Sequence, residues 1–268
     1  MEFIHIIVNN QNYLLSSEKI KEILKYPTIK PLAESSEFIK GIISHKDKII
    51  PILEVRKLLG FDSFAKNQVK LLKKVEAQHI SWMEDFESAL RENRPFQKAL
   101  DPHKCELGKW IDEALQCMRC NNDGFIDIVK NCVVPHHNAL HNQGKEFLAV
   151  TNADALETQV KTIKEHGAHT IQGLQILKDE IHRLSSSFEQ LIIYDIDGVD
   201  VGFIVDSVAG LHQLDEKSYN LGSEPLSKSN EFIHFIDHYE ENEALMFSMK
   251  FTRNVMTLVE QWREKEIA

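Results

Sequence analysis

Residues 65–93 read AKNQVKLLKKVEAQHISWMEDFESALREN, and this stretch decides how the rest of the chain is organised. Its apolar residues recur at close to the period of an amphipathic helix, with polar residues between them. The apolar positions are Val69, Leu72, Val75, Ile80, Met83, Phe86 and Leu90. The sequence before residue 65 has short apolar runs separated by turns instead. A long helix here therefore marks a boundary between two kinds of structure.

Further helical segments follow the first. Residues 107–120 (LGKWIDEALQCMRC) have a helical pattern, and residues 154–184 form a long polar segment with an apolar stripe. Between them, residues 125–150 predict a short helix, a break at Pro135 and a new helix that accepts the proline in its first turn. Helices joined by short connections pack antiparallel, so we expect a four-helix bundle over residues 64–186.

On both sides of the helical segment the pattern is typical of β-strands. Residues 41–55 (GIISHKDKIIPILEV) hold two apolar runs around a polar turn, which indicates a hairpin. Asp197-Gly198 separates two strand-like runs within residues 191–208, and residues 232–251 predict another hairpin. Residues 252–265 are amphipathic and predict a C-terminal helix.

Each of the two β regions, residues 1–63 and 187–268, is small for an independently folded domain. We therefore expect one discontinuous β domain, interrupted by the helical module at residues 64–186. Such an insertion is tolerated where chain ends lie close together at a surface. The predicted fold class is α+β with two domains.

Composition limits the function classes. The chain has 268 residues and a net charge of −10, which argues against broad contact with nucleic acid or an anionic membrane. No stretch approaches the roughly 20 apolar residues that span a bilayer, and the N-terminus lacks the basic region of a signal peptide. The chain is therefore expected to be soluble and cytoplasmic. Its four cysteines all lie within residues 105–132, and in a cytosolic setting such a group indicates a metal or redox role rather than a disulfide framework.

A histidine-rich stretch, PHHNALHN at residues 135–142, raises the question of a metal site. His137 and His141 are four residues apart, about 40° of rotation on a helix, so they point the same way and can share one ion. His136 points elsewhere, toward solvent or a neighbouring helix. The HxxxH pair alone leaves a metal site and a solvated helix equally open.

Two further motifs favour the metal site. HISW places His79 three residues before Trp82, and KCELGKW places Cys105 just before a helix that carries Trp110. In an antiparallel bundle, one ligand from each of these segments and the HxxxH pair make a tetrahedral His3Cys set. Zinc is the metal that suits imidazole and thiolate ligands in a tetrahedron.

The three motifs HxxW, CxLGxW and HxxLH, in this order and on helices, resemble the chemoreceptor zinc-binding (CZB) domain over about residues 66–150. The resemblance implies that His79, Cys105, His137 and His141 bind Zn²⁺. It also implies a sensing role, in which hypochlorous acid oxidises the zinc-bound cysteine or zinc itself is the signal. A zinc-bound cysteine is a thiolate, the form that oxidants attack.

The outer segments resemble CheW, the adaptor of bacterial chemotaxis arrays, through residues 37–60 (EFIKGIISHKDKIIPILEVRKLLG) and 202–214 (GFIVDSVAGLHQL). The resemblance implies two small five-stranded β-barrels that share a core, no enzymatic activity, and binding to the histidine kinase CheA and to chemoreceptor tips. One turn departs from the family: Ser44, His45, Lys46 and Asp47 stand where the family has Asn-x-Arg-Gly. Lysine lacks the planar fork of arginine, so contacts through this turn are an open question.

Two other functions fit the same residues. A zinc hydrolase would use His79, His137 and His141 with water in the fourth position and Cys105 unbound, but no carboxylate stands out as the general base of an HExxH motif does. A constitutive scaffold would use zinc only to hold the bundle together.

Three cysteines and the long helix leave smaller questions. Cys117 and Cys120 form a CxxC pair that is either ordinary helix residues or an auxiliary thiol pair, and Cys132 is expected in the core. The segment 154–184 has more apolar surface than one bundle needs, so a homodimer through the helices is a further expectation.

Overall fold

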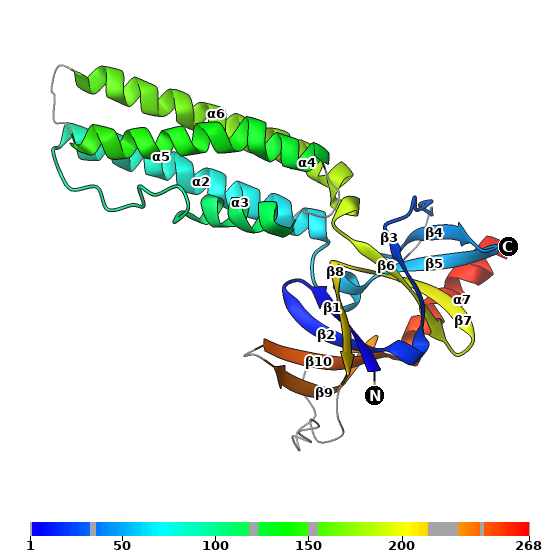
Figure 1. The fold of residues 1–268 in the computed structure, drawn as a ribbon. Coiled ribbons are helices and arrows are strands. Elements are labelled where there is room, and N and C mark those ends of the chain that lie inside the picture. Colours follow the sequence, from blue (N-terminus) through cyan, green and yellow to red (C-terminus); the bar gives the residue numbers. More distant parts are fainter. Residues whose placement is uncertain are drawn as a thin grey trace. The chain divides into compact units, whose positions relative to one another are not determined.

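The computed structural model describes residues 2–32, 36–117, 123–149, 155–213, 230–241 and 244–267. The chain divides into two compact units, which we call the β unit (residues 1–64 and 186–268) and the helical unit (residues 65–185). The β unit is thus assembled from both ends of the chain (Figure 1).

The helical unit contains four rod-like segments that run alongside one another (Figure 1). They are α2 (Phe64–Arg91), α3 (Glu106–Cys117), a rod made of α4 (Asp123–Ile128) and α5 (Val134–Ala149), and α6 (Leu156–Leu184). The expected break at Pro135 is not found. A π-helical turn at Val129–Val133 joins α4 directly to α5. Pro135 lies in the first turn of α5, where a backbone N–H would have no acceptor within the helix, so its absence costs no hydrogen bond.

Aromatic packing holds α2, α5 and α6 together. Trp82 stacks on Phe86 with ring centroids 5.0 Å apart, and both pack with Leu140 of α5 and Ile163 of α6. Gly144 of α5 faces the Trp82 ring so closely that a Cβ on it would lie 2.7 Å from the ring. The Trp82 indole of α2 therefore packs in close contact with the backbone of α5 at Gly144.

The β unit contains two five-stranded sheets. The first has the order β8 (Ser207–Gln213), β1 (Glu2–Val8), β2 (Gln11–Ser16), β10 (Ala244–Phe251), β9 (Ile233–Glu241). The second has the order β3 (Ile20–Lys25), β6 (Gln190–Ile196), β7 (Val199–Val205), β5 (Lys48–Glu54), β4 (Ile39–His45). In both sheets, strands from before and after the helical unit lie side by side, through the parallel pairs β2–β10 and β5–β7 among others (Figure 1).

The short elements of the β unit connect or cover the sheets. They are a 3-10 turn at Ser17–Lys19, α1 (Val55–Leu58), a 3-10 turn at Ser185–Ser187 and the C-terminal helix α7 (Arg253–Ile267). One core joins both sheets and α7: Phe203 of β7 stacks on Phe251 of β10 at 3.8 Å between centroids, and Val255 of α7 packs into the same cluster. The two sheets therefore belong to a single domain.

The predicted hairpins are confirmed. β6 and β7 pair through Asp197 and Gly198, whose φ angles of 51° and 86° are those of a type I′ turn. β4 and β5 pair through Lys46 and Asp47, with φ angles of 48° and 62°. β9 and β10 pair as expected, and α7 is the predicted C-terminal helix.

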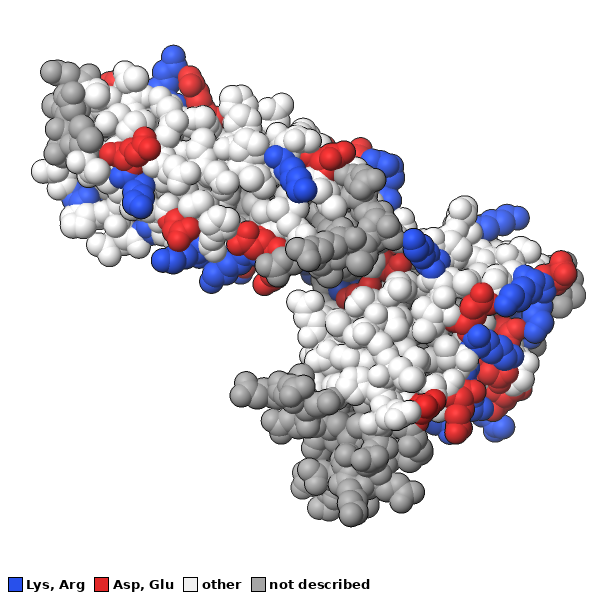
Figure 2. All heavy atoms as spheres, viewed as in Figure 1, with Lys and Arg blue, Asp and Glu red and all other residues white. Residues whose placement is uncertain are grey.

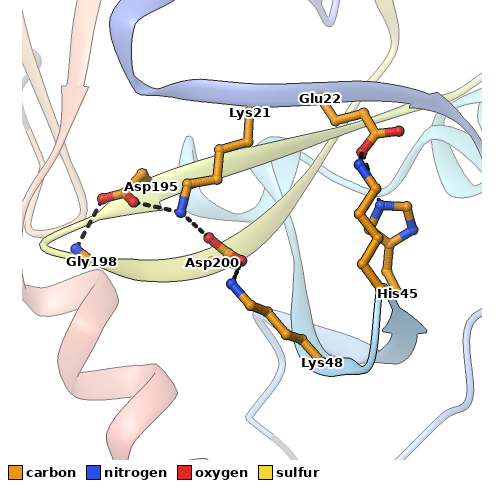
Figure 3. A network of polar contacts seen from close by, with 8 residues as sticks. Lys21, Glu22, His45, Lys48, Asp195, Gly198 and Asp200 are labelled. Atoms are coloured by element: carbon orange, nitrogen blue, oxygen red, sulfur yellow. Dashed lines mark hydrogen bonds and ion pairs between the residues drawn. The ribbon is translucent and has the colours of Figure 1, made fainter.

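Side chains link the outermost strands of the second sheet, β3 and β4. Glu22 of β3 accepts a hydrogen bond from Lys46 at 2.6 Å and contacts His45 at 2.9 Å (Figure 3). Lys30, beyond the end of β3, forms an isolated bridge with Ile42 of β4. On the same part of the sheet, Lys21 bridges Asp195 and Asp200, and Lys48 also binds Asp200 (Figure 3). These ion pairs link side chains of β3, β6, β7 and β5 across the sheet.

Charges of both signs are interspersed over the face shown in Figure 2. None of the helices in the described ranges combines the length and hydropathy required to cross a lipid bilayer.

Candidate metal centre

The four residues predicted as ligands lie together in the helical unit. His79 lies on α2, Cys105 immediately precedes α3, and His137 and His141 lie on α5. Their ligand atoms all lie within 4.8 Å of one another. The Cys105 Sγ is 3.1 Å from His137 Nε2 and 3.9 Å from His79 Nε2. The three imidazoles are buried, whereas Cys105 is partly exposed.

Backbone carbonyls orient two of the three imidazoles. His79 Nδ1 donates to the carbonyl of Val75 at 2.7 Å, and His141 Nδ1 donates to the carbonyl of Ala99 at 3.2 Å. Each of these rings therefore keeps the lone pair on Nε2 for another partner. The buried Nε2 of His141 has no hydrogen-bond partner within the described part of the chain. A buried acceptor left in this way needs an explanation, and a metal ion supplies one.

The protonation states suit metal binding. Burial, reinforced by repulsion from His141 and His79, lowers the pKa of His137 to about 2. Burial and the neighbouring His79 lower the pKa of His141 to about 4, and burial also lowers the pKa of His79. All three rings are therefore neutral near pH 7, which is the form that coordinates a metal.

The sulfur of Cys105 is held by backbone groups at the start of α3. The N–H of Gly108 donates to Sγ at 3.2 Å, and the carbonyl of Pro102 lies 3.2 Å from it. Burial raises the pKa of the thiol, and the backbone N–H groups of Gly108 and Leu107 oppose that effect. A cation beside the sulfur shifts the balance to the thiolate.

One tryptophan takes part in the geometry of the centre. The Trp82 ring lies 5.2 Å from the His141 ring, and its Nε1 donates at 2.9 Å to the same Ala99 carbonyl that accepts from His141. Sequence patterns do not reveal this role of Ala99, because a backbone carbonyl has no side-chain signature. Trp110 donates to Gln68 and packs near Phe125.

The other singled-out residues lie elsewhere. His136 points away from the cluster and stacks on His169 of α6 at 4.6 Å, as predicted. Cys132 is partly exposed rather than fully buried. Cys120 and the side chain of Cys117 lie outside the described residues, so the predictions for that pair stay open.

Two family models match the chain. A CheW-like domain matches residues 2–79, and a chemoreceptor zinc-binding domain matches residues 79–148.

The chain contains a CheW-like domain followed by a chemoreceptor zinc-binding domain.

Both resemblances stated from the motifs are thereby confirmed, and the match to the zinc-binding domain spans all four clustered residues, which form a potential zinc site. Three neutral imidazoles and one thiol are the donor set that tetrahedral zinc prefers.

The crystal structure of the scaffolding protein TtCheW from Thermoanaerobacter tengcongensis is similar, with 13% identity, 94% of this chain and 90% of that chain covered, and a TM-score of 0.42. A comparison with the curated proteins found no match.

Proposed function

We propose that this protein is a chemotaxis adaptor, in which a discontinuous CheW-like domain (residues 1–63 and 187–268) is interrupted by a helical zinc-binding module (residues 64–186). The division of the chain into two units supports the insertion, because both sheets combine strands from the two ends of the chain. Two five-stranded sheets with a common core, one of them with its outer strands bridged, support a double β-barrel.

The partners we propose are the histidine kinase CheA and the cytoplasmic tips of chemoreceptors, which places the protein in the cytoplasm. The CheW-like match supports this assignment. The unusual turn keeps a tight hairpin geometry without the family's glycine, since Lys46 and Asp47 adopt the left-handed conformation themselves. Lys46 is bound to Glu22, so a partner that uses this cation has to compete with that ion pair.

We assign zinc binding to His79, Cys105, His137 and His141. Zinc bound there stabilises the thiolate form of Cys105 and so makes the sulfur reactive at neutral pH. The four side chains fill a tetrahedral set, and for this reason we propose no enzymatic activity.

The chemical event we propose is oxidation of Cys105. The thiolate attacks the chlorine of hypochlorous acid, and the net reaction converts the thiolate and hypochlorous acid to a sulfenic acid and chloride. Sulfur loses two electrons and chlorine gains them. The sulfenic acid is a poorer ligand, so the cluster loses one donor at the residue from which α3 starts. The signal is thereby a change in the helical unit that alters binding of the adaptor to its partners.

The observation that carries this proposal is the position of Cys105. Its Sγ lies within hydrogen-bonding distance of His137 Nε2, and of the four clustered residues it is the one that is partly exposed. An exposed ligand of a buried set is the one that an oxidant reaches first.

The test measures zinc per chain by elemental analysis, in protein purified without added metal or chelator. Wild type and Cys105→Ala are compared with Cys132→Ala, a matched change at a cysteine outside the cluster. We expect one zinc per chain in wild type and Cys132→Ala, and weakened retention in Cys105→Ala. Zinc retention that does not depend on Cys105 would favour the three-histidine hydrolase.

Titration with hypochlorous acid then separates a sensor from a constitutive scaffold. We expect mass spectrometry to find Cys105 oxidised before Cys132, and binding to CheA and receptor fragments to change after oxidation. Modification of other cysteines first, or unchanged binding, would leave zinc with a structural role.

Homodimerisation is a separate proposal. Ile80 of α2 and Ile176 of α6 are exposed, and their burial between two copies would reduce the apolar surface in contact with water. Light scattering over a range of protein concentrations tests this, and a mass of one chain at every concentration would contradict it.

A further inference from the structure

A groove of about 660 Å³ lies beside the metal centre. It is formed by α2, the segment that ends at Cys105, and the start of α3. Of the four clustered residues, Cys105 and His79 line it, whereas His137 and His141 do not. A molecule in the groove therefore lies against Cys105. The volume is within the range of small-molecule sites and far exceeds that of hypochlorous acid.

The groove is apolar inside. Ala77, Trp82 and Ala99 line it together with the aliphatic parts of longer side chains. Such a lining favours the body of an organic molecule over a small hydrated ion.

The charged groups around the groove leave one cation without a carboxylate. Lys74 pairs with one oxygen of Glu106 at 2.5 Å, and the Gln78 amide donates to the other at 2.6 Å. Lys98 is different: its Nζ donates to the Ser81 carbonyl at 2.6 Å and to the Ser81 hydroxyl at 2.8 Å, and it has no ion-pair partner within the ranges that the structure covers. An ammonium has three N–H donors, so one of them stays available to an anion.

We propose that this groove binds small organic anions that carry an oxidising chlorine, namely N-chloramines of amino acids or sulfonates, with Lys98 holding the anionic group while the chlorine meets Cys105. This inference rests on the proposed sensing role of Cys105 and names the class of oxidant that the site selects. Reaction of hypochlorous acid with amines is the kind of reaction that supplies such molecules.

The reaction balances with water as the only other reactant. The Cys105 thiolate takes the chlorine as the N–Cl bond breaks, and the nitrogen keeps the electron pair and gains a proton. Water then replaces chlorine on the sulfur. The net products from the thiolate, one chloramine and one water are a sulfenic acid, the amine and chloride.

The experiment compares an anionic with a neutral reagent on the zinc-loaded full chain. Second-order rate constants for sulfenic acid formation at Cys105, trapped with dimedone and measured by mass spectrometry, are determined for N-chlorotaurine, which carries a sulfonate, and for monochloramine, which is uncharged. The variants are Lys98→Gln, Lys98→Arg and, as a control for net charge, Lys161→Gln. Lys161 lies on α6 and does not line the groove.

We expect Lys98→Gln to lower the rate constant for N-chlorotaurine by about two- to fivefold, which corresponds to the free energy of one surface ion pair. The rate constant for monochloramine should stay unchanged. Lys98→Arg should restore the rate, and Lys161→Gln should leave both rates at the wild-type value. Equal slowing of both reagents, or no slowing of either, would overturn the inference while leaving the oxidant-sensing proposal intact. A Cys105 that hypochlorous acid itself does not oxidise would overturn both.

Discussion

The carbonyl oxygen of Ala99 accepts hydrogen bonds from two side chains, His141 and Trp82. The first bond fixes which nitrogen of His141 faces the other ligands. The second bond fixes the carbonyl itself, because the indole is held by its stacking on Phe86. Partners of this kind, one bond beyond the ligands, tune the affinity of a metal site.

Replacement of Trp82 by phenylalanine removes the indole N–H and keeps an aromatic ring. We expect zinc affinity to fall by about tenfold, because the Ala99 carbonyl and hence His141 lose an anchor. Competition with a chromogenic chelator measures the affinity. Trp110→Phe is the control, since its indole bonds to Gln68, and it should retain wild-type affinity. Equal losses in both variants would indicate general destabilisation instead.

Glu189 in the β unit is a buried carboxyl with an altered pKa. Burial raises its pKa from 4.5 to about 7, against the attraction of Lys40 and with repulsion from Glu54 and Asp206. The folded chain therefore keeps a proton that the unfolded chain loses above pH 4.5. Stability is unaffected below that pH and falls as the pH rises from about 4.5 to about 7.

Glu189→Gln removes the titrating carboxyl and with it the fall in stability between about pH 4.5 and pH 7. We expect the variant to be more stable than wild type at pH 8, by on the order of 1 to 3 kcal/mol, and equally stable at pH 4.5. Lys40 retains Glu54 at 2.7 Å, so its charge stays paired. Denaturant unfolding at both pH values measures the difference. Glu37→Gln, at an exposed carboxylate, is the matched control for the loss of one negative charge, and a Glu189→Gln variant less stable than wild type at pH 8 would contradict the prediction.

At the scale of elements, the close approach of α5 to α2 depends on Gly144. Alanine favours a helix over glycine by up to about 1 kcal/mol, so intrinsic propensity predicts that Gly144→Ala stabilises the helical unit. The added Cβ would lie 2.7 Å from the buried Trp82 ring, which is held by its stacking on Phe86 and its hydrogen bond to the Ala99 carbonyl. Overpacking of this kind costs about 1 to 3 kcal/mol, and the clash outweighs the propensity.

We therefore expect Gly144→Ala to lower the melting temperature and to weaken zinc binding, because α5 carries two ligands. Circular dichroism and chelator competition measure the two effects. Gly124→Ala, at an exposed position of α4, provides the comparison and should stabilise the helical unit. If Gly144→Ala raised the melting temperature instead, α5 and α2 would be able to move apart without a loss of packing free energy.

At the scale of the whole molecule, the β unit is built from two distant parts of the sequence. Its core draws on Ile6 and Leu53 from the first part and on Phe203 and Phe251 from the second. Phe64 and Phe188, where the chain leaves and re-enters the unit, lie with ring centroids 5.6 Å apart. A short linker can therefore replace the helical unit without stretching the chain.

We expect a chain in which residues 65–185 are replaced by a short glycine-serine linker to fold cooperatively with the β-sheet circular dichroism of the β unit. A chain that ends at Phe64 should stay unfolded, because the first sheet then lacks β8, β9 and β10 and the second lacks β6 and β7. An unfolded linker variant would show that the β unit depends on the helices.

The sequence by itself determined the helices, the hairpins, the division into a helical and a β part, and the four residues that cluster. The elements follow from local periodicity and from turn residues such as Asp197-Gly198, and the pairing of His137 with His141 follows from their four-residue spacing on one helical face. His79 and Cys105 joined the set through the HxxW and CxLGxW motifs and the family resemblance that these motifs carry.

Only the tertiary structure decided the π-helical turn before Pro135 and the carbonyl of Ala99 as an anchor. It also decided the side-chain contacts between β3 and β4, and the groove that Lys98 and Cys105 both line. Each of these depends on backbone atoms or on residues brought together from separate segments. Backbone groups are the same in every residue, and contacts between distant segments leave no periodic pattern, so neither can be read along the chain.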